Sequence, residues 1–169
     1  MRTAVLCVTV FAALLLAPAF AAAPEVGARS PDFNLKDQFG KVWNLADMTG
    51  AVTILVAADP DSGRAMGPWV DALKSRYSGK ARILGLLDLH TVPGIGRGIA
   101  KSRIRRETKD PMMLDFGGVV SRAYGISSKC PTVVVIDKAL IVRAVVTAAC
   151  DKETLQTITS AVDKALGIT

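Results

Sequence analysis

The chain has 169 residues and a formal net charge of +6 at pH 7, from 21 basic and 15 acidic side chains. A chain of this length buries roughly two-thirds of its unfolded surface as one domain, so size alone requires no disulfide or metal. The charge surplus is modest, and no internal repeat or low-complexity linker divides the sequence. These features exclude a repeat protein and a small protein that needs disulfides or a metal to fold, and they favour one globular domain.

The first 23 residues have the pattern of a secretory signal. Arg2 gives a basic start, an apolar run covers residues 4–16, and small residues that suit signal peptidase follow. The run is shorter than the roughly 20 residues that a membrane span needs, and Pro18 interrupts the segment. We therefore expect residues 1–23 to be cleaved. The remaining residues, 24–169, are predicted to be a periplasmic or secreted domain with no stable membrane anchor.

The first half of the domain is predicted to form a hairpin and then a βαβ unit. Residues 31–45 carry apolar positions on both sides of a glycine turn, as short hairpins do. Residues 53–58 and 82–89 are nearly continuous apolar runs, which are typical of central strands covered on both faces. A helix between them makes the two strands parallel, with a right-handed crossover. The helix is predicted from apolar residues at helical spacing, namely Met66, Trp69, Val70, Leu73 and Tyr77.

A second helix is predicted over Gly98–Arg106, with Ile99 and Ile104 facing inward. It lies in a strongly basic stretch whose one acid is Glu107. No aromatic residue interleaves with the basic ones, and an exported protein rarely meets nucleic acid, so a nucleic-acid partner is not expected. The stretch is predicted to be a solvated helix face, with a surface for an anionic ligand or acidic partner as the alternative. Its basic residues are Arg97, Lys101, Arg103, Arg105, Arg106 and Lys109.

The last third of the chain predicts a second hairpin and a closing helix. After a short strand and one helical turn, residues 132–137 and 140–146 should pair antiparallel across the tight connection Lys138-Ala139. Asp151 is a suitable N-cap for the final helix, and Gly167 ends it. The apolar stripe of that helix is Leu155, Ile158, Val162 and Leu166.

The resulting order, ββαβα, a short connection and then ββα, resembles the thioredoxin-like superfamily. The opening GARSPDFNLKDQFGKVWNL is similar to the start of redoxin domains, and Pro68 falls at the family's kink proline. Cys130-Pro131-Thr132 is similar to the family's cis-proline loop. The likeness is to the exported redoxin and peroxiredoxin-like branch, which includes AhpC/TSA and TlpA-like proteins. It implies an α/β three-layer fold with a central mixed sheet of four or five strands, flanking helices, an N-terminal hairpin and a cis bond before Pro131.

A narrower resemblance concerns residues 91–106, TVPGIGRGIAKSRIRR. This segment is similar to the matching region of YtfJ-like periplasmic proteins, a redoxin-related family that can lack the cysteine pair. Its glycines do not make a dinucleotide-binding fingerprint, because Ile99 stands where the third glycine belongs. A tight turn is the better interpretation of the glycines.

The resemblance also indicates what the chain lacks. It places Pro60 and Gly63 where the two cysteines of the family's Cys-x-x-Cys turn stand. Thiol exchange needs a thiolate with a lowered pKa at the helix N-terminus and a resolving sulfur beside it, and these residues supply neither. A hydrolase is not indicated either, because no nucleophile elbow surrounds Ser62 and the sole histidine, His90, follows a different strand.

Two cysteines remain in the domain, Cys130 and Cys150. In an oxidising compartment they form a structural disulfide, stay as two free thiols, or act as a relocated redox pair, and the sequence leaves all three open. The hairpin register places Cys150 only a few residues beyond the position opposite Cys130, which favours the bridge. A copper site with His90 and Met66 lacks the usual spacing, so no metal and no cofactor are expected.

Two functions follow from these features. The first is a redox-inactive binding or scaffolding module, a pseudoenzyme that keeps the groove of the fold for an exported protein or peptide partner. The second is a thiol-disulfide oxidoreductase or peroxiredoxin-like antioxidant protein that uses Cys130 and Cys150. The residues predicted to form the groove are Asp59, Pro60, Asp61, Ser62, Gly63, Arg64, Cys130 and Pro131.

Overall fold

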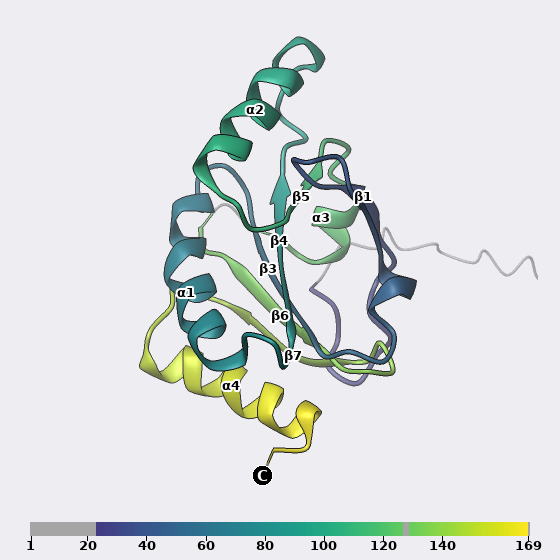
Figure 1. Cartoon of the computed structure of the whole chain (residues 1–169), viewed down its shortest axis with the longest axis vertical. Helices are drawn as coiled ribbons and strands as arrows, with labels where there is room; N and C mark the ends of the chain where they lie inside the picture. Colours follow the sequence, from purple (N-terminus) through teal and green to yellow (C-terminus); the bar gives the residue numbers. More distant parts are fainter. Residues whose placement is uncertain (1–22, 127–128, 169) are drawn as a thin grey trace, which may run out of the picture.

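A computed structural model of the chain describes residues 23–126 and 129–168 (Figure 1). Residues 1–22, on which the signal-peptide prediction rests, lie outside the described part. A five-stranded mixed sheet forms the centre, in the order β5-β4-β3-β6-β7. Its strands are β3 (Thr53–Ala58), β4 (Arg82–Asp88), β5 (Met112–Asp115), β6 (Thr132–Ile136) and β7 (Val142–Thr147). A separate two-stranded sheet pairs β1 (Asn34–Lys36) with β2 (Val42–Asn44).

Strand β3 is the middle of the sheet, and all six of its residues are buried. It pairs in parallel with β4, with Thr53 opposite Arg82, and antiparallel with β6, with Ala57 opposite Thr132. The sequence TILVAA suits this position, because a strand covered on both faces needs apolar side chains at every residue. The predicted βαβ unit is therefore confirmed.

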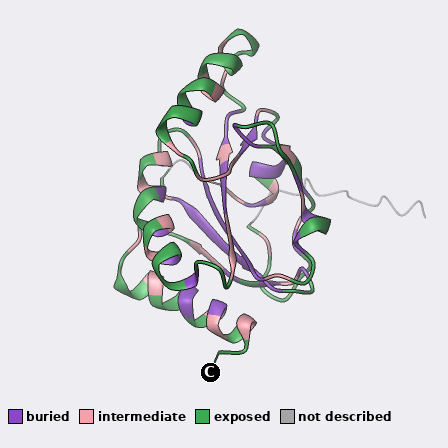
Figure 2. Ribbon diagram, in the orientation of Figure 1, coloured by how far each residue is buried: buried purple, intermediate pink, exposed green. Residues whose placement is uncertain are grey.

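Helices and the small hairpin cover the two faces of the sheet. On one face, α1 (Met66–Tyr77) and α4 (Lys152–Leu166) pack over β3 and β6 through Trp69 and Ile158. On the other face, the β1–β2 hairpin and α3 (Val119–Ala123) bury Phe33 and Tyr124 against the sheet. Figure 2 shows the buried residues concentrated in the strands between these layers. The predicted three-layer α/β fold with its N-terminal hairpin is confirmed.

The final helix begins and ends as the sequence predicts. The Asp151 carboxylate accepts a hydrogen bond from the Thr154 amide at 2.9 Å, in a capping box. Gly167 ends the helix in the left-handed region, at a φ of 75°. In the part of the chain that the structure describes, no helix is both long enough and apolar enough to cross a membrane.

Helix α2 (Arg97–Glu107) differs from the prediction at one of its two inward positions. Ile104 is buried, but Ile99 exposes 73% of its surface. The reason lies in the position of the helix, which extends past the end of the sheet (Figure 1). Only its C-terminal half meets the sheet edge, where Ile104 packs with Leu89 and Leu114.

The connection between β6 and β7 is longer than the two residues predicted. The Leu140 amide bonds to the Asp137 carbonyl, and Leu140 has a φ of 65°. This is the pattern of a turn followed by a left-handed residue, which makes a three-residue loop. The Asp137 side chain organises it by accepting hydrogen bonds from the amides of Ala139 at 2.8 Å and Ile141 at 2.9 Å.

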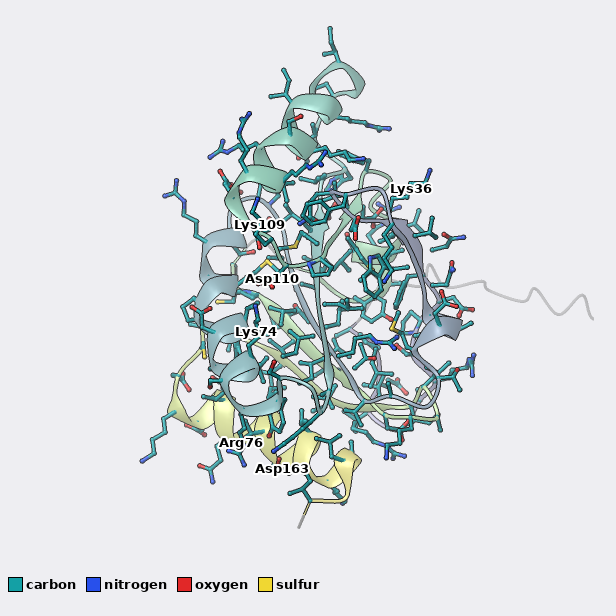
Figure 3. All side chains as sticks on the ribbon, in the orientation of Figure 1. Lys36, Lys74, Arg76, Lys109, Asp110 and Asp163 are labelled. Atoms are coloured by element: carbon teal, nitrogen blue, oxygen red, sulfur yellow. The ribbon has the colours of Figure 1, made fainter. Side chains whose placement is uncertain are left out.

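Replacing Tyr77 by Phe should destabilise the fold by about 1–2 kcal/mol, because it removes a hydroxyl whose two hydrogen-bond acceptors then lose their donor. The Tyr77 hydroxyl lies 2.8 Å from Asp163 Oδ1 and 3.0 Å from the Thr159 carbonyl, which ties α1 to α4. Urea denaturation measures the loss. Arg76 bonds to the same Asp163 but is 54% exposed, so Arg76→Ala is the control and should cost about 1 kcal/mol or less (Figure 3). Equal losses in the two variants would contradict the assignment.

Asp137 should make stability depend on pH. Burial raises the pKa of this carboxyl, but the hydrogen bonds from Ile141, Arg143 and Ala139 outweigh burial and lower it. A lowered native pKa contributes stability above the unfolded-state pKa of about 3.9, and that contribution is lost as the pH falls through the native pKa. Asp137→Asn should therefore cost about 1–3 kcal/mol near neutral pH, with the difference shrinking below about pH 4.

Urea denaturation at several pH values measures this effect. Asp71 is exposed, so Asp71→Asn is the matched control and should alter the free energy of unfolding little at every pH measured. A loss for Asp137→Asn that stays constant down to low pH would show that the charge of Asp137 contributes nothing.

Candidate functional site

The turn that follows β3 is held by one aspartate and one serine. The Asp59 carboxylate accepts hydrogen bonds from the Ser62 amide at 2.8 Å and from the Ser62 hydroxyl at 2.7 Å. These contacts draw the serine inward, so Ser62 is only 5% exposed. Ser62 was predicted to help form the groove, and this prediction is wrong because its side chain is buried. Pro60, Asp61 and Arg64 are exposed and form the outer surface of the turn.

The turn leads into a helical N-terminus that contains no sulfur. A short 3-10 segment, Gly63–Ala65, joins directly to α1, and no side chain caps either start. A β-carbon added to Gly63 would meet Leu87 Cδ1 at 3.6 Å, an ordinary van der Waals contact. A side chain therefore fits at residue 63. The lack of a thiol there comes from the sequence and not from a shortage of space.

Register places Pro131 beside the end of β3. Ala57 pairs with Thr132, and the Ala148 amide bonds to the Pro131 carbonyl at 3.1 Å, so Pro131 is buried between the ends of two strands. No peptide bond among the described residues is cis, so the bond before Pro131 is trans and the prediction of a cis bond was wrong. Trans is the favoured isomer of an X-Pro bond. Pro131 directly precedes β6, where the backbone need not donate a hydrogen bond to the sheet, so a trans proline is tolerated there.

The two cysteines are half-buried free thiols, so the expected disulfide is not formed. Each lies within two residues of the hydrogen-bonded pair formed by Pro131 and Ala148. Cys150 packs against the core between α1, α4 and the sheet. Burial raises the pKa of the Cys150 thiol, and the neighbouring negative charge of Asp151 raises it further. Both effects reduce the thiolate fraction that thiol exchange requires.

A groove of about 1240 Å³ opens beside the turn and runs between α1 and α2. Of the predicted groove residues it includes four: Pro60, Asp61, Gly63 and Arg64. Asp59, Ser62, Cys130 and Pro131 are not among its lining residues.

The floor of the groove was not anticipated from the sequence. Its apolar residues, Ile83, Leu87 and Met112, are half-buried on the sheet face that α1 and α2 cover only in part. The available signal was Gly85, an isolated glycine in the apolar run RILGLLDL. Such a glycine marks a close approach of another group, and a β-carbon there would lie 2.5 Å from Met112 Sδ.

The walls of the groove carry charges of both signs. Lys74 of α1 reaches across to Asp110, which follows α2, with 2.7 Å between Nζ and Oδ1 (Figure 3). Both side chains are 46% exposed, so this ion pair contributes little to stability. It gives the groove a polar edge above an apolar floor.

His90 and Asp88 form a second arrangement that sequence reasoning missed. His90 Nδ1 lies 2.9 Å from Asp88 Oδ1, and the same oxygen accepts the His90 amide at 3.0 Å. The pair orients the imidazole, but a hydrolase also needs a nucleophile that the histidine holds. The Ser62 hydroxyl bonds to Asp59 instead. Among residues 23–126 and 129–168, no group of three or more His, Cys, Asp or Glu side chains is arranged to hold a metal.

Comparison with known proteins identifies the fold. No family model matches the chain, and no curated protein matches it. Solved structures do match, including a Chlorobium tepidum protein described as thiol:disulfide interchange protein DsbE, at 22% identity and a TM-score of 0.65. That match covers 85% of this chain and 99% of the other.

Two further structures agree. The exposed lipoprotein thioredoxin Etrx1 of Streptococcus pneumoniae is 22% identical, with a TM-score of 0.60 over 77% of this chain and 99% of its own. A hypothetical protein from Sinorhizobium meliloti 1021 is 16% identical, with a TM-score of 0.65 over 86% of each chain. The TM-scores of the DsbE and Etrx1 structures, 0.65 and 0.60 over 85% and 77% of this chain, show that the chain has the thioredoxin-like fold.

Proposed function

We propose that the protein is an exported, redox-inactive binding module that takes a protein or peptide segment into the groove between α1 and α2. The observation that carries the proposal is the turn at Pro60–Gly63. The resemblance of the sequence places it where thioredoxin-like oxidoreductases hold their cysteines, and residues 60–63 contain no sulfur. The fold alone assigns no activity, so the chemistry of this turn is decisive.

The size and lining of the groove support the binding of a protein or peptide segment. Its volume of about 1240 Å³ exceeds that of a typical small-molecule pocket and suits several residues of an extended chain. An apolar floor at Ile83 and Leu87 favours buried side chains of a partner, and the charged edge at Lys74 and Asp110 provides polar contacts for its backbone. A catalytic site would instead be narrow, with several catalytic side chains directed at one point.

Export is supported by the N-terminal sequence pattern and by the structural neighbours. The pneumococcal neighbour is described as an exposed lipoprotein, which places that protein outside the cytoplasm. The narrower resemblance of residues 91–106 to YtfJ-like periplasmic proteins stays a prediction.

The alternative is an oxidoreductase that relies on Cys130 and Cys150. Their positions near the paired residues Pro131 and Ala148 favour it, since a short movement would bring such neighbours together. Chemistry disfavours it, because burial and Asp151 raise the pKa of Cys150. Cys150 directly precedes Asp151, the N-cap of α4, but the Asp151 carboxylate already accepts the Thr154 amide at that helix N-terminus, and its negative charge disfavours a thiolate.

Residues 24–169 should not catalyse the reduction of insulin by dithiothreitol, whereas Pro60→Cys with Gly63→Cys should gain this activity. The gain is expected because a thiol at residue 63 sits at the helical N-terminus, where thiolates are stabilised, with a second sulfur three residues earlier. The matched control moves the same pair to the far end of α1, as Ser75→Cys with Ser78→Cys at two exposed positions, where no activity should appear. Reductase activity in the unmodified protein would refute the proposed function.

Replacing Cys130 and Cys150 by serine tests the alternative. The double variant should keep the free energy of unfolding within about 1 kcal/mol, because two half-buried thiols give way to hydroxyls of similar size and no bridge is lost. Urea denaturation with and without reductant measures this. A peroxide-consumption or insulin-reduction activity that disappears in this variant would make the relocated oxidoreductase the correct function.

A further inference from the structure

The N-terminal half of α2 presents isoleucines to solvent. Ile95 exposes 96% of its surface and Ile99 exposes 73%, the highest values among the large exposed hydrophobic residues described. Ile95 lies in a 3-10 segment, Gly94–Gly96, that continues into α2. The two isoleucines are four residues apart on a helical segment, so they lie on the same side. Ile104 is the one residue of this helix that is buried.

The same segment is strongly cationic. Residues 91–106 contain five basic side chains and no acid: Arg97, Lys101, Arg103, Arg105 and Arg106. Arg103 and Arg106 follow Ile99 by four and seven residues, so the face that starts with two isoleucines continues with two arginines. The nearest acid, Glu107, pairs with Arg103 at 2.7 Å. The projecting tip therefore combines exposed apolar side chains with a surplus of positive charge.

The shape of this tip distinguishes between partners. Figure 1 shows α2 extending beyond the sheet at the end of the molecule opposite the C-terminus, and Figure 2 shows most of the helix exposed. A rigid protein partner would need a concave pocket to bury such a protrusion. A lipid headgroup layer deforms around it and offers both phosphate groups and acyl carbons.

We propose that the η3–α2 tip, residues 94–106, is a reversible docking surface for anionic phospholipid membranes. Ile95 and Ile99 enter the headgroup region, and Arg103 and Arg106 approach the lipid phosphates. Two isoleucines and a few charges hold a protein reversibly, and among residues 23–126 and 129–168 no helix is long and apolar enough to cross a membrane. The tip and the wall of the groove share Ile99 and Arg103, so the two proposals are tested apart: vesicle binding is measured without a peptide, and the insulin assay contains no membrane.

Vesicle sedimentation with residues 24–169, which contain every helix and strand described, tests the proposal. The protein should bind vesicles of phosphatidylcholine mixed with phosphatidylglycerol and should not bind phosphatidylcholine alone. Ile95→Ser with Ile99→Ser should weaken binding by about tenfold or more, because apolar area leaves the headgroup region. Arg103→Gln with Arg106→Gln should weaken it by about fivefold for each charge removed.

Matched controls lie far from the tip. Val26→Ser with Ile168→Ser removes two other exposed hydrophobic residues, which are 64% and 48% exposed, and should leave vesicle binding unchanged. Lys152→Gln with Lys164→Gln removes two charges from α4 and should weaken binding by less than the arginine pair. Circular dichroism should show every variant folded, since each substituted side chain is exposed or only half-buried.

Three results would overturn the proposal. The first is no binding to the anionic vesicles at low salt. The second is unchanged vesicle binding by the isoleucine double variant, or equal binding of the native protein to soluble polyglutamate. Either result would show that the tip is attracted to any polyanion. The third is a dimer in solution that the isoleucine double variant dissociates, which would assign the tip to a second copy of the chain.

Discussion

The pairing of β3 on both edges and its cover on both faces position almost everything else. Parallel pairing with β4 requires a crossover, which places α1 on one face, and antiparallel pairing with β6 places Pro131 beside the last residues of β3. The turn at residues 59–64 therefore leaves the sheet at the carboxyl end of β3, next to Pro131. Its backbone follows from the strand before it and the helix after it, whatever side chains it carries.

That constraint explains how the turn keeps its shape although residues 59–64 contain no cysteine. The Asp59–Ser62 hydrogen bonds hold the turn, and the helical N-terminus after Gly63 remains in place without a thiolate to stabilise. Space for a side chain at Gly63 is also retained. The turn and the groove between α1 and α2 therefore form without a cysteine at these positions.

Local patterns predicted the elements that depend on their own residues. TILVAA gave a central strand because all six positions are buried, and the Asp151 and Gly167 caps bound the last helix where the sequence placed them. The failures came from tertiary position. Ile99 faces solvent because α2 extends past the sheet, and nothing within RGIAKSRIRRE reveals where the sheet ends.

The site residues followed the same division. The sequence predicted which residues form the turn. It did not predict that Ser62 faces inward, because that orientation depends on the hydrogen bonds between Ser62 and Asp59. The groove floor depends on how far α2 stands from α1, which is a long-range property of the packing. The trans bond before Pro131 departs from the family pattern, so the resemblance alone could not settle the isomer.

The absence of an activated thiol is the central claim, and a short pulse of iodoacetamide on the native, reduced protein near pH 6 tests it directly. At this pH an ordinary thiol reacts slowly, whereas a thiolate with a lowered pKa reacts quickly. Intact-mass spectrometry should show the native chain unmodified after the pulse and both cysteines of residues 24–169 modified once the chain is unfolded at higher pH. Rapid modification of Cys130 or Cys150 in the native protein would contradict the account.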